Sequence, residues 1–173
     1  RRIKDGDIIH GHLTVDAIKL EDFNKKLISV IRDPYDRMLS EYNYTRRAYN
    51  NKNFISKNYK NKLYAAGNYS FEGYISYLKE NQPLHARYMS RFLIGKKKHT
   101  NPIEFVKDNY FALGILERMD LFIEDFYKKS NIRLNQYKTN ITKSKEHIDL
   151  SANERKAVKD FCDEDIDLYM NIK

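Results

Sequence analysis

The clearest hydrophobic pattern lies between residues 27 and 42. Leu27–Ile31 is a short apolar run rich in β-branched residues, bounded by two lysines and an Asp-Pro pair, which is typical of a buried parallel strand. Asp33 is suited to cap a following helix, and Pro34 suits its first position. The next apolar side chains recur at helical spacing and predict one packed stripe: Tyr35, Met38, Leu39 and Tyr42.

Two polar side chains of this segment lie where ligands often bind. Arg32 follows the predicted strand directly, at the carboxyl end where open α/β sheets bind ligands. Ser40 lies two turns into the predicted helix, on a face shared with Arg37, Tyr44 and Arg47. A guanidinium, a hydroxyl and a helix N-terminus close together suit a phosphate group. A plain strand–helix unit with a surface arginine fits the spacing equally well.

The rest of the pattern alternates helices with one further strand. The predicted helices are 71–80 with Ser70 as cap, 83–94 ending at Gly95, 103–109, one after residue 116 and a last one after the capping box 151–154. A second buried strand is expected at residues 111–115. Such strand–helix repeats support an α/β fold with a doubly wound parallel sheet.

Composition indicates a globular protein with an anionic partner. The 173 residues are 41% hydrophobic and 32% charged, which suits one domain spanning residues 1–173. The net charge of +8 favours nucleic acid, an acidic glycan, a nucleotide or a membrane surface. No apolar run approaches the length of a membrane span. The lone Cys162 excludes an internal disulfide and favours a reducing, cytoplasmic location.

The segment from residue 42 to residue 71 combines tyrosines with cations. It contains no aspartate or glutamate between Glu41 and Glu72. Aromatic faces with positive charges can stack on sugars or bases and attract an anionic polymer. A solvated loop in a lysine- and asparagine-rich protein explains the composition equally well.

A histidine pair precedes the first predicted strand. In an extended segment His10 and His12 project to the same side, so one of them could face a cleft. A metal site is weakly supported because no further ligand is near in sequence. Two ordinary histidines at a strand end are the simpler interpretation.

Residues 31–42 resemble a known family motif. They read I-R-D-P-Y-D-R-M-L-S-E-Y and resemble the R-D-P-x-x-R-x-x-S-x-Y motif of sulfotransferases that use 3′-phosphoadenosine 5′-phosphosulfate (PAPS), most closely the heparan 2-O-sulfotransferase-like branch that acts on carbohydrates. The resemblance implies a parallel sheet flanked by helices, similar to P-loop NTPases, and O-sulfation of a glycan acceptor without a metal. It also implies that Arg32 and Ser40 hold the 3′-phosphate of PAPS and of its product, adenosine 3′,5′-bisphosphate.

Other segments resemble the family at further sites. His10-Gly11-His12 is similar to the H-x-H pair whose second histidine deprotonates the acceptor, which makes His12 the candidate base and His10 its helper. An N-x-T-x-K-S pattern implies donor contacts from Thr142, Lys143 and Ser144. Residues 87–95 resemble N-Y-x-x-R-x-L-x-G, except that the family's asparagine is Arg87 here. The resemblance and the positive charge give three candidate acceptor contacts: Arg47, Arg87 and Arg91.

One family element is missing from the sequence. The P-K-x-G-[ST]-[ST] loop that holds the 5′-phosphosulfate has no counterpart among the six isolated glycines. We therefore expect that the domain is N-terminally incomplete, without its first strand and phosphate loop, or that it is a degenerate homologue, and that this chain alone does not turn over. A Golgi-lumenal catalytic domain is the alternative location. The competing functions are a non-catalytic domain that binds a polyanion or nucleic acid, and a nucleotide kinase-like enzyme.

Overall fold

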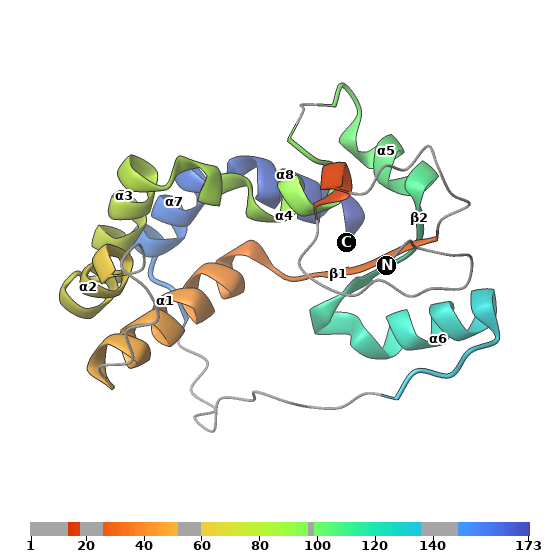
Figure 1. Cartoon of the computed structure of the whole chain (residues 1–173), viewed down its shortest axis with the longest axis horizontal. Helices are drawn as coiled ribbons and strands as arrows, with labels where there is room; N and C mark the ends of the chain where they lie inside the picture. Colours follow the sequence, from red (N-terminus) through yellow and green to blue (C-terminus); the bar gives the residue numbers. More distant parts are fainter. Residues whose placement is uncertain (1–13, 18–25, 52–59, 97–98, 136–148) are drawn as a thin grey trace.

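In the part of the chain that the structure describes, two parallel strands lie at the centre, with helices on both sides (Figure 1). Strand β1 (Leu27–Ile31) pairs with strand β2 (Tyr110–Ile115) in parallel register. The computed structural model describes residues 14–17, 26–51, 60–96, 99–135 and 149–173. Within these residues the protein is a mostly helical α/β structure, which confirms the predicted class of a parallel sheet flanked by helices.

The helices account for most of the described chain. The longer ones are α1 (Pro34–Asn50), α2 (Lys60–Asn68), α3 (Phe71–Asn81), α4 (Tyr88–Leu93), α5 (Pro102–Asn109), α6 (Met119–Ser130), α7 (Ala152–Phe161) and α8 (Asp163–Ile172). Three short 3-10 helices are η1 (Val15–Ala17), η4 (Pro83–Arg87) and η5 (Leu116–Arg118). No described helix is both long enough and apolar enough to cross a lipid bilayer.

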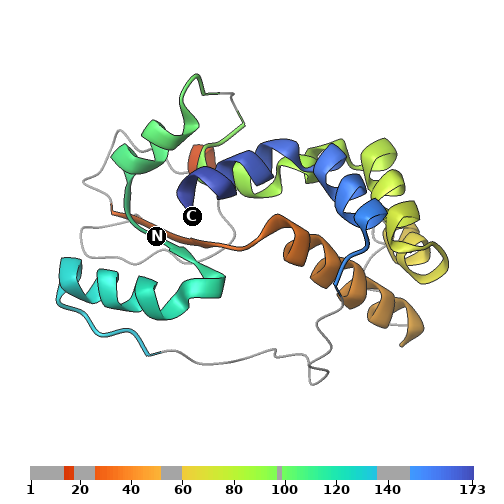
Figure 2. The ribbon, with the colours of Figure 1, turned by 180° about the vertical axis from the view of Figure 1, so that it is seen from behind.

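The two faces of the sheet are covered differently. Helix α6 packs against β2, where Phe122 fills the space over Gly114 so closely that a Cβ there would lie 2.6 Å from the ring. On the same face of β1, Ile28 and Val30 remain 49% and 40% exposed. The prediction that the first strand is buried on both faces is therefore wrong. The opposite face is covered by α4 and α8 (Figure 2).

The helices at the far end of the molecule from α5 and α6 share one core. Helices α1, α2, α3 and α7 gather there (Figure 1). Met38 and Tyr42 of the predicted α1 stripe are buried in this core against Tyr74, Leu78 and Val158. The stripe is confirmed, because its other two members, Tyr35 and Leu39, pack against the same cluster.

Several predicted boundaries changed in the structure. Residues 83–94 begin as η4 and become α-helical only at Tyr88. The expected single last helix is two helices, α7 and α8, which meet at Cys162. The described part of the tyrosine-rich segment forms the C-terminal part of α1 and the whole of α2, which pack against each other as a helical hairpin. These residues are therefore helical and do not form a loop.

Candidate functional site

The candidate site begins at the turn between β1 and α1. Asp33 caps α1, and its Oδ1 accepts hydrogen bonds from the Tyr35 N–H at 2.8 Å and the Asp36 N–H at 3.3 Å. The Arg37 N–H donates to the Asp33 carbonyl oxygen, and Pro34 has no N–H. Every amide of the first turn is therefore already used. In this structure, the helix N-terminus therefore has no unused backbone donor in its first turn to offer a phosphate.

The side chains of Arg32 and Ser40, in contrast to these backbone amides, are free to bind a ligand near this turn. Arg32 is half-buried at the carboxyl end of β1 and makes no hydrogen bond or ion pair within the described residues. Within the described residues it forms no ion pair with the neighbouring Asp33, whose carboxylate caps α1. Ser40 is exposed two turns into the helix. Both residues thus belong to one strand–helix unit, and a phosphate there would be bound by side chains.

Glu117 fixes this turn from the end of the second strand. Its Oε1 accepts a hydrogen bond from the Asp33 N–H at 3.1 Å, and its Oε2 accepts one from the Tyr169 hydroxyl at 3.3 Å. Burial, together with the negative charges of Glu117 and Asp33, raises the pKa of Tyr169 to about 12. The phenol therefore stays protonated and donates, so that both strand ends and α8 are joined beside Arg32.

The residue after Ser40 is the centre of a partly buried charge cluster. Glu41 contacts Lys62 Nζ at 2.5 Å, His85 Nε2 at 2.8 Å and the Tyr74 hydroxyl at 3.1 Å. Burial raises the pKa of Glu41, but the hydrogen bond with His85 and the charges of His85 and Lys62 outweigh it and lower the pKa to about 2. Sequence reasoning missed this cluster. Its one local signal is the i, i+4 spacing of Arg37 and Glu41.

Arg37 belongs to this cluster and not to the face of Ser40. Its Nη1 lies 3.4 Å from Glu41 Oε2, and its guanidinium lies over the Tyr88 ring at 5.0 Å from the centroid. Its Nη2 also approaches Cys162 Sγ at 3.8 Å. Burial nevertheless raises the pKa of Cys162 to about 12, so this thiol is neither a nucleophile nor a base.

The three candidate acceptor contacts lie on different elements. Arg47 is exposed on the second half of α1. Arg87 forms an ion pair with Glu164 of α8 at 2.6 Å, so an acceptor would have to compete with that carboxylate. Arg91 is half-buried on α4, without a hydrogen bond or ion pair within the described residues. Of the three, Arg47 and Arg91 can receive an anion without breaking a described contact.

Five candidate residues lie outside the described residues: His10, His12, Thr142, Lys143 and Ser144. The chain that follows the histidines is anchored, however. Val15 is buried, and Asp16 Oδ2 accepts a hydrogen bond from the Lys96 N–H at 2.6 Å, beside Gly95 with its positive φ of 88°. This contact joins η1 to the end of α4.

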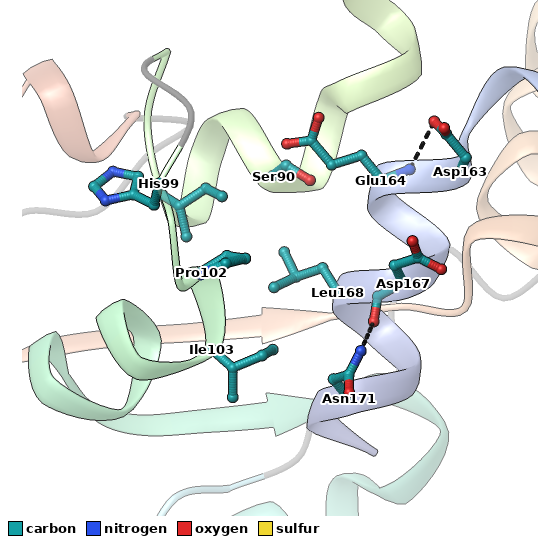
Figure 3. Close-up of a pocket in the computed structure, with 10 residues that line it drawn as sticks. Ser90, His99, Pro102, Ile103, Asp163, Glu164, Asp167, Leu168 and Asn171 are labelled. Carbon is teal, nitrogen blue, oxygen red and sulfur yellow. Dashed lines mark hydrogen bonds between the residues drawn. The ribbon is translucent and has the colours of Figure 1, made fainter.

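A pocket of about 340 Å³ lies between α8 and the segment that joins α4 to α5 (Figure 3). Its lining is acidic, since Asp163, Glu164 and Asp167 come from α8 and no lysine or arginine of the described residues lines it. An anionic nucleotide would be repelled there, so this pocket does not suit PAPS. In the described part of the chain, no three histidine, cysteine, aspartate or glutamate side chains are placed to hold a metal ion.

Comparison with known proteins identifies the family. Searches of curated proteins and of solved structures gave no significant match. A family model described as "Sulfotransferase domain" matches residues 2–166, a range that includes every candidate residue discussed above. The chain therefore belongs to the sulfotransferase domain family.

Proposed function

We propose that this protein transfers a sulfuryl group from PAPS to a hydroxyl group of a carbohydrate acceptor. Membership in the sulfotransferase family supports the reaction class. The observation that carries the proposal is the half-buried Arg32, which has no described ion partner and stands at the carboxyl end of β1, directly before the helix that carries Ser40.

Arg32 and Ser40 would bind the 3′-phosphate of the donor. A guanidinium presents paired N–H donors that match phosphate oxygens, and the seryl hydroxyl adds a further donor. The first-turn amides of α1 are used by Asp33, so binding would depend strongly on the Arg32 side chain. PAPS supplies the activated sulfuryl group, and the family resemblance adds Thr142, Lys143 and Ser144 as further donor contacts.

His12 would act as the general base, helped by His10. It would remove the proton from the acceptor hydroxyl as that oxygen forms its bond to sulfur and the bond from sulfur to the phosphate oxygen breaks. An imidazole suits this task because its ordinary pKa lies near neutral pH. In the sequence, His12 precedes buried Val15 by three residues, so it can lie no more than about 11 Å of extended chain from it.

The acceptor would be a glycan that carries negative charge. The net charge of +8 favours such a partner. Arg47 and Arg91 are the candidate contacts, because neither is held by a carboxylate within the described residues. Arg87 would contribute only if the acceptor displaced Glu164 from it.

A thermal-shift assay tests the donor site directly. Adenosine 3′,5′-bisphosphate should raise the melting temperature of the protein more than AMP does, because only the former has the 3′-phosphate. Arg32→Ala should remove most of this difference, whereas Arg133→Ala, which changes an arginine that lies over Tyr127 of α6, should not. Equal shifts by the two nucleotides in the unaltered protein would contradict the proposal.

The base is tested separately from the donor site. In the complete protein, His12→Ala should abolish transfer from PAPS while the thermal shift by adenosine 3′,5′-bisphosphate is kept. Lost nucleotide binding with normal turnover would refute the role. An oligonucleotide that stabilises the protein more than the bisphosphate does would instead support the competing function, a non-catalytic domain that binds nucleic acid.

A further inference from the structure

The hairpin of α1 and α2 presents two exposed tyrosine rings side by side. Tyr64 and Tyr69 are 54% and 44% exposed. Their ring centroids are 6.3 Å apart, with the planes at 88° to each other. Tyr49 of α1 meets Tyr64 in the same edge-to-face manner at 6.5 Å. Tyr64 and Tyr69 therefore form an ordered aromatic surface, and the ring of Tyr49 packs against that of Tyr64.

The backbone that carries these rings is held by several contacts. The Tyr42 hydroxyl donates to the Tyr69 carbonyl oxygen at 2.8 Å, and Arg46 Nη1 donates to the Tyr42 oxygen at 3.2 Å. Gly67 packs against the Tyr49 ring so closely that a Cβ there would overlap it. Rings mounted on a fixed backbone lose little conformational entropy when a ligand stacks on them.

Positive charge flanks the rings. Lys60 is exposed and lies one turn before Tyr64 on the same face of α2. Arg46 is exposed beside the backbone of Tyr69, through the contacts of Tyr42. Lys62, the other cation of α2, is instead buried against Glu41. No acidic residue occurs between positions 42 and 71, so the surface is positive without a compensating carboxylate from this segment.

We propose that Tyr64 and Tyr69, flanked by Lys60 and Arg46, form a stacking surface for sugar rings of an acidic glycan. This inference rests on the proposed function, since the glycan would be the acceptor chain. A sugar polymer with an occasional carboxylate fits two separated cations and two aromatic faces. Single-stranded nucleic acid has a phosphate on every unit and is normally bound by a continuous row of cations. Among the described residues, the cations named for this surface are Lys60 and Arg46.

The surface is separate from the donor site. Arg46 lies six residues along α1 from Ser40, which is about 9 Å of helix, and twice as far from Pro34. It also points about 120° away from Ser40 around the helix axis. Only an acceptor of several sugars could reach from the transfer site to Tyr64 and Tyr69. The surface therefore selects long chains over short ones.

Direct binding measurements test this inference without turnover. The probe is a decasaccharide of alternating uronic acid and N-acetylhexosamine, titrated calorimetrically into the protein without donor. Replacing both rings (Tyr64→Ala with Tyr69→Ala) should raise the Kd by about 10-fold or more, because both aromatic faces on which sugars would stack are lost. The double Tyr→Phe variant should bind like the unaltered protein, since it keeps both faces.

The matched control is Tyr127→Ala on α6. Tyr127 is also exposed, and Arg133 lies over its ring, so this variant measures the effect of removing an exposed tyrosine near a cation elsewhere on the protein. Lys60→Gln should weaken binding of the acidic decasaccharide but not of a neutral N-acetylhexosamine decasaccharide. Melting temperatures of all variants establish that they are folded.

The outcomes separate this surface from the donor site. Decasaccharide binding that is unaffected by the double Tyr→Ala change would overturn the inference, even if adenosine 3′,5′-bisphosphate still stabilises the protein. Ring-dependent glycan binding with no bisphosphate effect would leave the surface in place and refute the donor site. A ten-nucleotide single-stranded DNA that binds the rings more tightly than the glycan would also overturn the assignment.

Discussion

Neighbouring residues of α1 have opposite environments, as Ser40 and Glu41 show. Ser40 faces outward and is exposed, which leaves its hydroxyl available to a ligand. Glu41 faces inward, where groups from three other elements bind it: Lys62 from α2, Tyr74 from α3 and His85 from η4. This carboxylate therefore fixes the rotation of α1 about its axis, and with it the direction in which Ser40 points.

Replacing the carboxylate should destabilise the protein. Glu41→Gln removes the negative charge and leaves the partly buried Lys62 and Arg37 without it, so we expect the free energy of unfolding to fall by about 3 kcal/mol. Urea denaturation followed by circular dichroism measures this change. The matched control is Glu124→Gln on α6, which breaks an exposed ion pair with Lys128 and should have little effect. Similar losses in both variants would contradict the importance of the buried cluster.

The lowered pKa of Glu41 also predicts how stability depends on pH. Its pKa is about 2 in the folded protein against an ordinary value of 4.5, so the folded state favours the ionised form. The resulting stabilisation, of the order of 3 kcal/mol, is complete above pH 4.5 and is lost as the pH falls towards 2. The difference in stability between the unaltered protein and Glu41→Gln should therefore shrink across this range. A difference that is the same at pH 6 and pH 2.5 would refute it.

At the level of elements, local chemistry made some boundaries predictable from sequence. Asp33 followed by Pro34 specifies a helix start, and α1 begins there. Ser70 caps α3 through the Gly73 N–H. Ser151 with Glu154 forms both hydrogen bonds of the capping box of α7. In each case the side chain that determines the boundary lies within three residues of the backbone groups it satisfies.

Features that depend on distant partners could not be predicted in this way. Arg37 has the helical spacing of Ser40's face, but its side chain turns towards Tyr88 and Cys162, which are far away in sequence. Lys62 reads as a surface cation, yet it is buried because Glu41 lies opposite. The break at Cys162 has no glycine or proline to mark it. Packing between elements decides these features.

The cap at the β1–α1 turn gives a prediction at the level of an element. Asp33→Ala removes the acceptor of the Tyr35 and Asp36 amides and should lower the free energy of unfolding by about 1 kcal/mol. Hydrogen exchange at these two amides should become faster. Asp33→Asn keeps an oxygen acceptor and should restore most of the loss, whereas an equal effect of both variants would argue against capping.

At the scale of the whole molecule, the break between α7 and α8 joins two packed regions. Helix α7 packs with α1 and α3 in one cluster, and α8 covers the sheet together with α4 in another. The break turns Asp165 towards the start of α4. There the fully buried carboxylate accepts hydrogen bonds from the Met89 N–H, the Ser90 N–H and the Ser90 hydroxyl, at 2.9, 2.8 and 2.6 Å. Asp165 thus replaces the N-terminal cap that α4 lacks in its own sequence.

Removing this contact should affect both stability and the donor site. Asp165→Ala leaves three buried donors without an acceptor, so we expect a loss of about 3 kcal/mol or more in the free energy of unfolding. Ser90→Ala removes one of the three hydrogen bonds and should cost about 1 kcal/mol. Urea titrations of both variants measure the difference, and equal costs would show that Asp165 does not organise α4.

Asp165→Ala should also alter the position of the β1–α1 turn, which carries Arg32. Helix α8 bears Tyr169, which donates to Glu117, and Glu117 in turn accepts from the Asp33 N–H. If Asp165→Ala lets α8 move, the hydrogen bonds from Tyr169 to Glu117 and from Asp33 to Glu117 weaken as well. The rise in melting temperature produced by adenosine 3′,5′-bisphosphate should then be smaller. Tyr169→Phe is the matched test, because it keeps the packed ring of α8 and removes only the hydroxyl that donates to Glu117. A smaller shift in both variants would establish that the position of α8 controls the donor site, whereas an unchanged shift in Tyr169→Phe would exclude this route.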